Sequence, residues 1–172
     1  MTRRAICAAL AVAVPLVNTN PAQDKEQRNR AIIREHVDRI NREGPKAAAE
    51  GFAEGLTHQG HPVTRESRVR VLEDIFNTFP DYHSEILEMV AEGDSVVVRS
   101  RVSGTHRGVG KLAVNGGMLV GVPPTQKRFE VETIHWYKLR DGKIVEHYAG
   151  RDDVGMMRQL GLVPEIGLPI TK

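Results

Sequence analysis

The spacing of apolar residues changes halfway along this 172-residue chain, and that change limits the folds available to it. In residues 24–43 apolar side chains recur every three or four positions, which predicts an amphipathic helix ending at Gly44. The alanine-rich residues 46–56 predict a short second helix, and residues 57–62 a loop. A third helix is expected from the cap Thr64 until Pro80 stops it.

The second half has the period of β-strands. Residues 82–92 and 94–104 predict consecutive antiparallel strands, and a glycine-rich loop follows. Residues 127–140 and 143–151 flank Asp141-Gly142, the preferred two-residue type I′ hairpin turn. Helices first and an antiparallel sheet afterwards predict an α+β fold in which the helices cover one face of a curved sheet and leave a pocket.

The first residues have the layout of a secretory signal peptide. Arg3 and Arg4 precede an apolar run over residues 5–17, and polar residues follow it. We therefore expect a signal peptide over residues 1–22 and a mature domain over residues 23–172, located outside the cytoplasm. The run is shorter than the ~20 residues that span a bilayer, so no membrane association is expected after cleavage. A buried N-terminal helix is the alternative interpretation.

Charge and cysteine content argue against several classes of function. The chain has 24 Lys+Arg and 22 Asp+Glu, and loss of Arg3 and Arg4 would make the balance neutral. Mixed charges and 5% aromatic residues do not predict nucleic-acid binding. Cys7, the only cysteine, lies in the apolar run, so the mature chain would have no thiol. The histidine spacing matches no local ligand pattern; neither a metal nor an organic cofactor is expected.

The hairpin turn predicts which side chains share a face of the sheet. Counting outward from Asp141-Gly142 places Tyr137 opposite Glu146, His135 opposite Tyr148, and Val131 opposite Asp152. Side chains alternate between faces, so one face would carry these residues together with Thr133. That mixture of apolar and polar groups suits a small-molecule pocket, although the period alone does not decide which face looks inward.

Two residues of this face are candidates for proton transfer. Desolvation could raise the pKa of Asp152 and make it a general acid or base, although an exposed carboxylate or a helix N-cap is an equally ordinary role. His135 could take a proton or hydrogen-bond a carbonyl group, or could be a structural strand histidine. The candidate substrate-binding residues are Tyr137, Tyr148, Thr133, His58, His83 and His106.

Six short segments occur in an order that we recognise. They are residues 79–83 (FPDYH), 92–99 (EGDSVVVR), 104–108 (GTHRG), 121–125 (GVPPT), 141–147 (DGKIVEH) and 152–161 (DDVGMMRQLG). Together they resemble the SnoaL-like polyketide cyclase, or ester cyclase, family over about residues 27–161. The chain departs from the family in extra residues between Gly108 and Gly121, in Gln126 for a glycine, and in Tyr148 for a tryptophan.

The resemblance implies a nuclear-transport-factor-2-like (NTF2-like) cone and, as a family property, a homodimer. It also implies ring closure of an aromatic polyketide ester by intramolecular aldol condensation, without a cofactor and with an aspartate as acid/base. By its place in the last segment, Asp152 matches that aspartate, and His135 or a tyrosine would stabilise the enolate oxygen.

Three functions therefore compete. The first is a cofactor-free cyclase, isomerase or hydrolase acting on a small, partly apolar carbonyl compound. The second is a non-catalytic protein that binds a small hydrophobic ligand, and the third is a fold used mainly for dimerisation. A buried Asp152 beside the cavity would favour the enzyme, whereas an apolar cavity with Asp152 in solvent would favour the binding protein.

Overall fold

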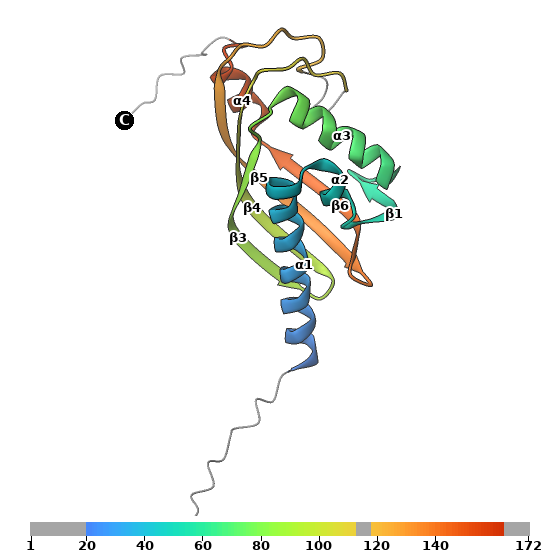
Figure 1. Cartoon of the computed structure of the whole chain (residues 1–172). Helices are drawn as coiled ribbons and strands as arrows, with labels where there is room; N and C mark the ends of the chain where they lie inside the picture. The colour runs from blue at the N-terminus through green and yellow to red at the C-terminus, as the bar shows by residue number, and fades with distance from the viewer. Residues whose placement is uncertain (1–19, 113–117, 164–172) are drawn as a thin grey trace, which may run out of the picture.

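The computed structural model describes residues 20–112 and 118–163, and the helices precede most of the sheet as predicted (Figure 1). The helices are α1 (Pro21–Glu43), α2 (Pro45–Ala49), α3 (Arg65–Thr78) and α4 (Asp153–Gln159). The strands are β1 (Phe52–His58), β2 (His61–Thr64), β3 (His83–Glu92), β4 (Ser95–Thr105), β5 (Arg128–Arg140) and β6 (Lys143–Arg151).

The six strands form one curved, unclosed sheet in the order β2-β1-β6-β5-β4-β3. Strands β3 to β6 form the expected antiparallel meander, but β1 pairs parallel to β6. The sheet is therefore mixed, and the prediction of a purely antiparallel sheet is wrong. Helix α1 packs against β3 and β4, and α3 packs against β1 and β2, so the helices cover one face of the sheet (Figure 1).

Residues 46–56 are the main error of the sequence prediction. The alanine-rich helix ends at Ala49, and Phe52 begins a strand that pairs with both β2 and β6. Gly51 and Gly55 weaken the helix, and the two strand partners supply the backbone hydrogen bonds that a helix would otherwise provide. The predicted loop is likewise the tip of the β1–β2 hairpin, where Gln59 and Gly60 have φ angles of 50° and 81°.

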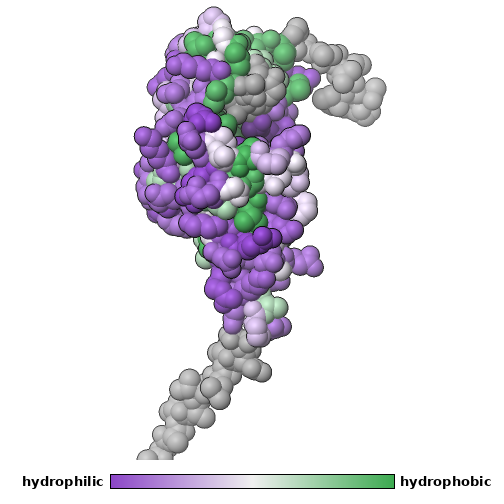
Figure 2. Space-filling view, turned by 90° about the vertical axis from the view of Figure 1, so that its right-hand side faces the viewer, coloured by the Kyte–Doolittle hydropathy of each residue, from purple (hydrophilic) through white to green (hydrophobic). Residues whose placement is uncertain are grey.

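Capping residues define both ends of helix α1. The Asn20 side chain accepts a hydrogen bond from the Ala22 amide, and Gly44, with φ of 82°, ends the helix. The exposed first turn extends below the sheet and is mainly hydrophilic (Figure 2). No helix among the described residues is long and apolar enough to cross a membrane. The predicted signal peptide falls almost wholly on residues 1–19, which lie outside the described residues, so it stays a prediction.

The connection between β4 and β5 is held against α3 by hydrogen bonds that its backbone amides donate. The amides of Arg107 and Gly108 donate to the Thr78 carbonyl, and the buried Asp74 carboxylate accepts from the amides of Lys111 and Leu112. A Cβ atom on Gly108 would lie 1.9 Å from the Asn77 carbonyl oxygen, so only glycine fits there. This packing makes Leu112 a lining residue of the cavity described below.

Candidate active site

A β-bulge in the last hairpin decides which residues face the helices. Arg140 pairs with Lys143 and Leu139 with Ile144, as the turn predicts, but Lys138 then pairs with Glu146. Val145 is thus an extra residue, and every later residue of β6 changes face.

The observed pairs differ from the predicted ones by this one residue. Tyr137 lies opposite His147, His135 opposite Ala149, and Thr133 opposite Arg151. Tyr148 consequently lies on the outer face, where its ring is 5.7 Å from that of Trp136. The expectation that Tyr148 lines the pocket is wrong.

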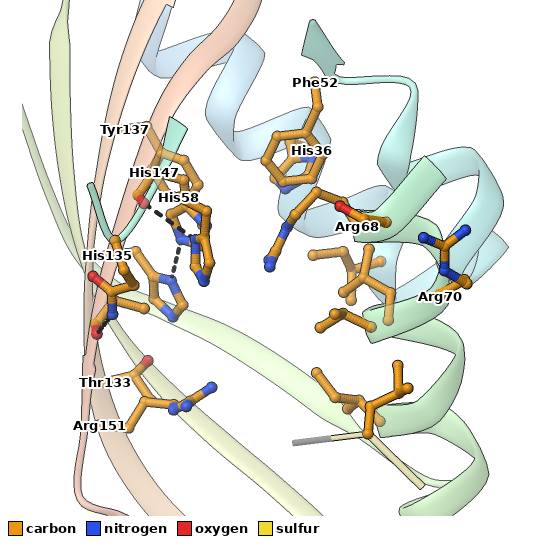
Figure 3. A pocket seen from close by; sticks show the side chains of 18 of the residues that line it. His36, Phe52, His58, Arg68, Arg70, Thr133, His135, Tyr137, His147 and Arg151 are labelled. Atoms are coloured by element: carbon orange, nitrogen blue, oxygen red, sulfur yellow. Dashed lines mark hydrogen bonds between the residues drawn. The ribbon is translucent and has the colours of Figure 1, made fainter. Parts of the chain in front are cut away.

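A cavity of about 630 Å³ lies between the inner face of β5 and β6 and the facing side of α3 (Figure 3). This volume is in the range of small-molecule sites. Four predicted residues line it: His135, Tyr137, Thr133 and His58. The other lining residues are His36, Ile40, Phe52, Gln59, Ser67, Arg68, Arg70, Val71, Leu72, Ile75, Tyr82, Leu112, His147, Ala149, Arg151 and Asp153.

Three further predicted residues lie elsewhere. Asp152 is exposed and caps α4, because its carboxylate accepts a 2.8 Å hydrogen bond from the Gly155 amide. His106 is fully buried against Phe79, with Nδ1 3.3 Å from the Thr125 hydroxyl. His83 is exposed at the start of β3. The structure therefore does not bring these side chains into the cavity, and Asp152 adopts the capping role that was the ordinary alternative.

The sequence analysis missed His36, His147, Arg68, Arg151 and Tyr82. His36 and Arg68 occupy positions on the apolar stripes of their helices. A polar residue in such a stripe faces the core, and this could have marked both as candidate cavity residues. Regular alternation outward from Asp141-Gly142 predicts His147 and Arg151 on the other face, because nothing local to the hairpin indicates the bulge.

Four histidines from four elements line the cavity as a cluster: His36 of α1, His58 of β1, His135 of β5 and His147 of β6 (Figure 3). His135 Nδ1 and His147 Nε2 are 2.9 Å apart, so one imidazole donates a hydrogen bond to the other. His58 Nδ1 lies 3.2 Å from the His147 carbonyl oxygen and must donate to it. The Tyr137 ring stacks on His147 at 4.7 Å, which fixes the orientation of both rings.

Burial keeps this histidine cluster uncharged. It lowers the pKa of His36, His58 and His135 to about 4, and that of His147 well below its usual value, because a charged imidazolium is poorly solvated there. The positive charge of Arg68 lowers all four pKa values further. Burial also raises the pKa of Tyr82 to about 12 and that of Tyr137 even more, so both phenols keep their protons. The cavity therefore holds neutral imidazoles and phenols at neutral pH.

Arg68 is the unusual charge of the site. Only 8% of the residue is exposed, its guanidinium lies 5.5 Å from the centre of the Phe52 ring, and Nε has no hydrogen-bond partner among the described residues. The one carboxylate among the described lining residues is Asp153, which pairs with Arg151 at 3.4 Å. In the described part of the chain, no three His, Cys, Asp or Glu side chains are grouped so that they could hold a metal ion.

A model of the SnoaL-like polyketide cyclase family matches residues 30–160, which is most of the chain and includes the whole cavity lining. The chain belongs to the SnoaL-like polyketide cyclase family.

Curated relatives match this SnoaL-like chain over shorter stretches. Nogalonic acid methyl ester cyclase of Streptomyces nogalater is 49% identical over 45 residues, which are 26% of this chain and 34% of that protein. Aklanonic acid methyl ester cyclase DnrD of Streptomyces peucetius is 48% identical over 54 residues, covering 30% of this chain and 37% of that protein. The matched stretches thus span about a third of each curated relative.

Solved structures agree with the SnoaL-like fold over most of the chain. AclR of Streptomyces galilaeus is 25% identical with a TM-score of 0.69, covering 83% of this chain and 86% of its own. IdmH of Streptomyces antibioticus is 28% identical with a TM-score of 0.63, covering 77% and 98%.

Several of the SnoaL-like motif residues support the fold and do not line the cavity. Asp81 accepts hydrogen bonds of 2.7 Å from both the amide and the hydroxyl group of Thr105, which joins the segment at residues 79–83 to that at residues 104–108. Gly104 lies against Phe79, where a Cβ atom would be 2.9 Å from the phenylalanine Cβ. The motifs thus identify the fold more directly than they identify the reacting groups.

Proposed function

We propose that this SnoaL-like chain is a cofactor-independent acid/base enzyme of cyclase type that closes a ring in a small, partly apolar carbonyl compound. The observation that carries the proposal is the hydrogen-bonded His135–His147 pair, uncharged and lining the cavity. The curated relatives, which are named as cyclases of nogalonic and aklanonic acid methyl esters, support the reaction class.

In the proposed reaction His135 is the general base. Its Nδ1 is engaged with His147, so Nε2 is the atom left for substrate. Nε2 removes a proton from the carbon next to a carbonyl group, and the resulting enolate carbon attacks a second carbonyl carbon of the same molecule. The new alkoxide then takes the proton back from His135, so the product is an isomer of the substrate.

The low pKa of His135 keeps Nε2 unprotonated at neutral pH, but it also makes the buried imidazole a weak base. The imidazolium is formed together with an enolate anion, and a hydrogen bond donated by a phenol would stabilise that anion and offset the weak basicity. Tyr82 and Tyr137 both line the cavity as neutral phenols.

The polarity of the cavity distinguishes the proposed enzyme from a non-catalytic binding protein. The exposed Asp152 would favour a non-catalytic binding protein if the cavity were apolar, but four histidines and three arginines are among its lining residues. These groups support the enzyme, with the histidine pair in place of Asp152 as the proposed base.

The test uses a synthetic aromatic compound that carries a 1,5-dicarbonyl chain, can close a six-membered ring, and is supplied both as the free acid and as the methyl ester. In D₂O the protein is expected to accelerate exchange of the α-proton over buffer alone, measured by proton NMR, and in H₂O to produce a ring-closed isomer of unchanged mass. Release of methanol from the ester, leaving the free acid, would indicate a hydrolase. Binding of either form without exchange or product would favour the binding protein.

We also propose a homodimer formed through the outer face of the sheet. Val90, Ile134 and Trp136 are each about half exposed there, which is unusual for large apolar side chains on a sheet. Trp136→Glu is expected to convert a dimer into a monomer in sedimentation velocity, whereas Val154→Glu on α4 leaves the dimer intact. A monomeric native protein would contradict this proposal.

Export through the predicted signal peptide is proposed on the sequence pattern alone.

A further inference from the structure

The guanidinium of Arg68 lies in the cavity, whereas the other arginines of α3 form ion pairs with glutamates. Arg70, two residues later, forms a 2.7 Å ion pair with Glu66 and is exposed, and Arg65 pairs with Glu54 at 2.7 Å. Arg68 instead reaches from α3 toward His58 and His147 on the opposite side of the cavity (Figure 3). Its guanidinium is therefore directed at the space that a ligand would occupy.

A buried arginine without an anionic partner is costly. Guanidinium stays protonated in proteins, and desolvating a single charge costs several kcal/mol unless an opposite charge or hydrogen bonds replace the lost water. The Phe52 ring at 5.5 Å offsets a part of this cost. The surrounding imidazoles are neutral, and Asp153 already pairs with Arg151. Among the described residues, the cavity thus has one uncompensated positive charge.

We propose that Arg68 is the binding site for a carboxylate of the substrate, and that the substrate is a carbonyl compound with a free acid group. The proposal rests on the proposed function and adds the substrate class to it. The planar fork of guanidinium pairs with both oxygens of a carboxylate, and removal from water strengthens that pair. Because Arg68 projects toward the histidines, a carboxylate on it would place the neighbouring carbon atoms near the His135–His147 pair.

The rest of the cavity fits an acid with an apolar body. Val71, Leu72, Ile75 and Leu112 provide apolar contacts beyond Arg68, and the volume of about 630 Å³ accommodates a bicyclic molecule. The curated relatives are named for methyl esters, in which the carboxylate is esterified and has no charge. An unpaired buried arginine therefore predicts a free acid for this chain.

The experiment compares two probes of the same shape, 2-naphthoate and methyl 2-naphthoate, by isothermal titration calorimetry with the full chain. Naphthoate is expected to bind about 10- to 100-fold more tightly than its methyl ester, as for one charge-assisted ion pair. Arg68→Met, which keeps the packing against Phe52, is expected to abolish this preference, and Arg68→Lys to restore a part of it. Arg99→Met removes an equal charge from the outer face and is expected to leave the preference unchanged.

Folding of Arg68→Met is checked by urea denaturation, where its stability is expected to equal or exceed that of the wild type, because it removes a buried charge. Equal binding of the two probes by the wild type, no binding of either, or an acid preference that persists in Arg68→Met would overturn the proposal. Since this readout is binding, a preference for the acid without turnover would retain the Arg68 site and remove only the enzymatic reaction.

Discussion

Replacing His135 with glutamine is expected to lower the turnover number for ring closure by about 10²- to 10⁴-fold, with a much smaller change in KM. Glutamine can hydrogen-bond to His147 and fill most of the space, but it cannot accept a proton from carbon. Steady-state kinetics on the 1,5-dicarbonyl compound, with α-proton exchange as a second readout, measures the effect. Free imidazole is expected to restore a part of the activity to His135→Ala, because the small molecule can occupy the vacated space.

Asp152→Asn is the matched comparison, since it removes the acid/base group that the family resemblance implies. Asparagine caps helices as well as aspartate, so α4 should remain intact. The exposed position of Asp152 predicts turnover within a few-fold of the wild type. A large loss in Asp152→Asn together with normal turnover in His135→Gln would show that the aspartate is the base and that our assignment to the histidine pair is wrong.

Acidification from pH 6.5 to pH 4 is expected to lower the free energy of unfolding by several kcal/mol. In the folded protein the pKa values of His36 and His135 are about 4 and that of His147 lies well below its usual value, whereas unfolded histidines take up protons near pH 6.5. The unfolded state therefore binds more protons throughout this window, and stability falls as pH falls. The fully buried His36 alone accounts for a loss on the order of 3 kcal/mol.

The groups that face the cluster strengthen this effect. Arg68 on α3 and Arg151 on β6 are cations that oppose a charge on the imidazoles, and Asp153, the described lining residue of opposite sign, is paired with Arg151. A second proton on the cluster would also meet the first, because His135 and His147 are in contact.

Urea denaturation at several pH values between 7 and 4 measures this dependence. His36→Leu is expected to reduce the slope of stability against pH by up to about 1.4 kcal/mol per pH unit, the contribution of one proton. Val37→Ala, at the neighbouring buried position of α1, should lower stability by a similar amount at every pH. Parallel curves for the wild type and His36→Leu would show that His36 takes up its proton as readily in the folded state.

The features that the sequence determined by itself have local causes. Helix α1 ends at Gly44-Pro45, α3 lies between Thr64 and Phe79, and Asp141-Gly142 with positive φ angles forms the expected turn. The strict alternation of β5 correctly put Thr133, His135 and Tyr137 on one face, and the structure shows that this face looks inward. In each case neighbouring residues fix the backbone, so a short stretch of sequence carries the information.

The tertiary structure decided the rest, through pairings between distant segments. Residues 52–58 form a strand because β6 and β2 offer hydrogen bonds on both sides, which outweighs the helical preference of the run before them. The bulge at Val145 lies where β6 also meets β1, and the Ile144 amide donates to the Gly51 carbonyl. The sequence of a hairpin turn cannot encode that contact. The bulge places His147 and Arg151 in the cavity and Tyr148 outside it, and Asp152 caps α4. The sequence therefore determined the fold class and one side of the site, while long-range pairing selected the groups available for chemistry.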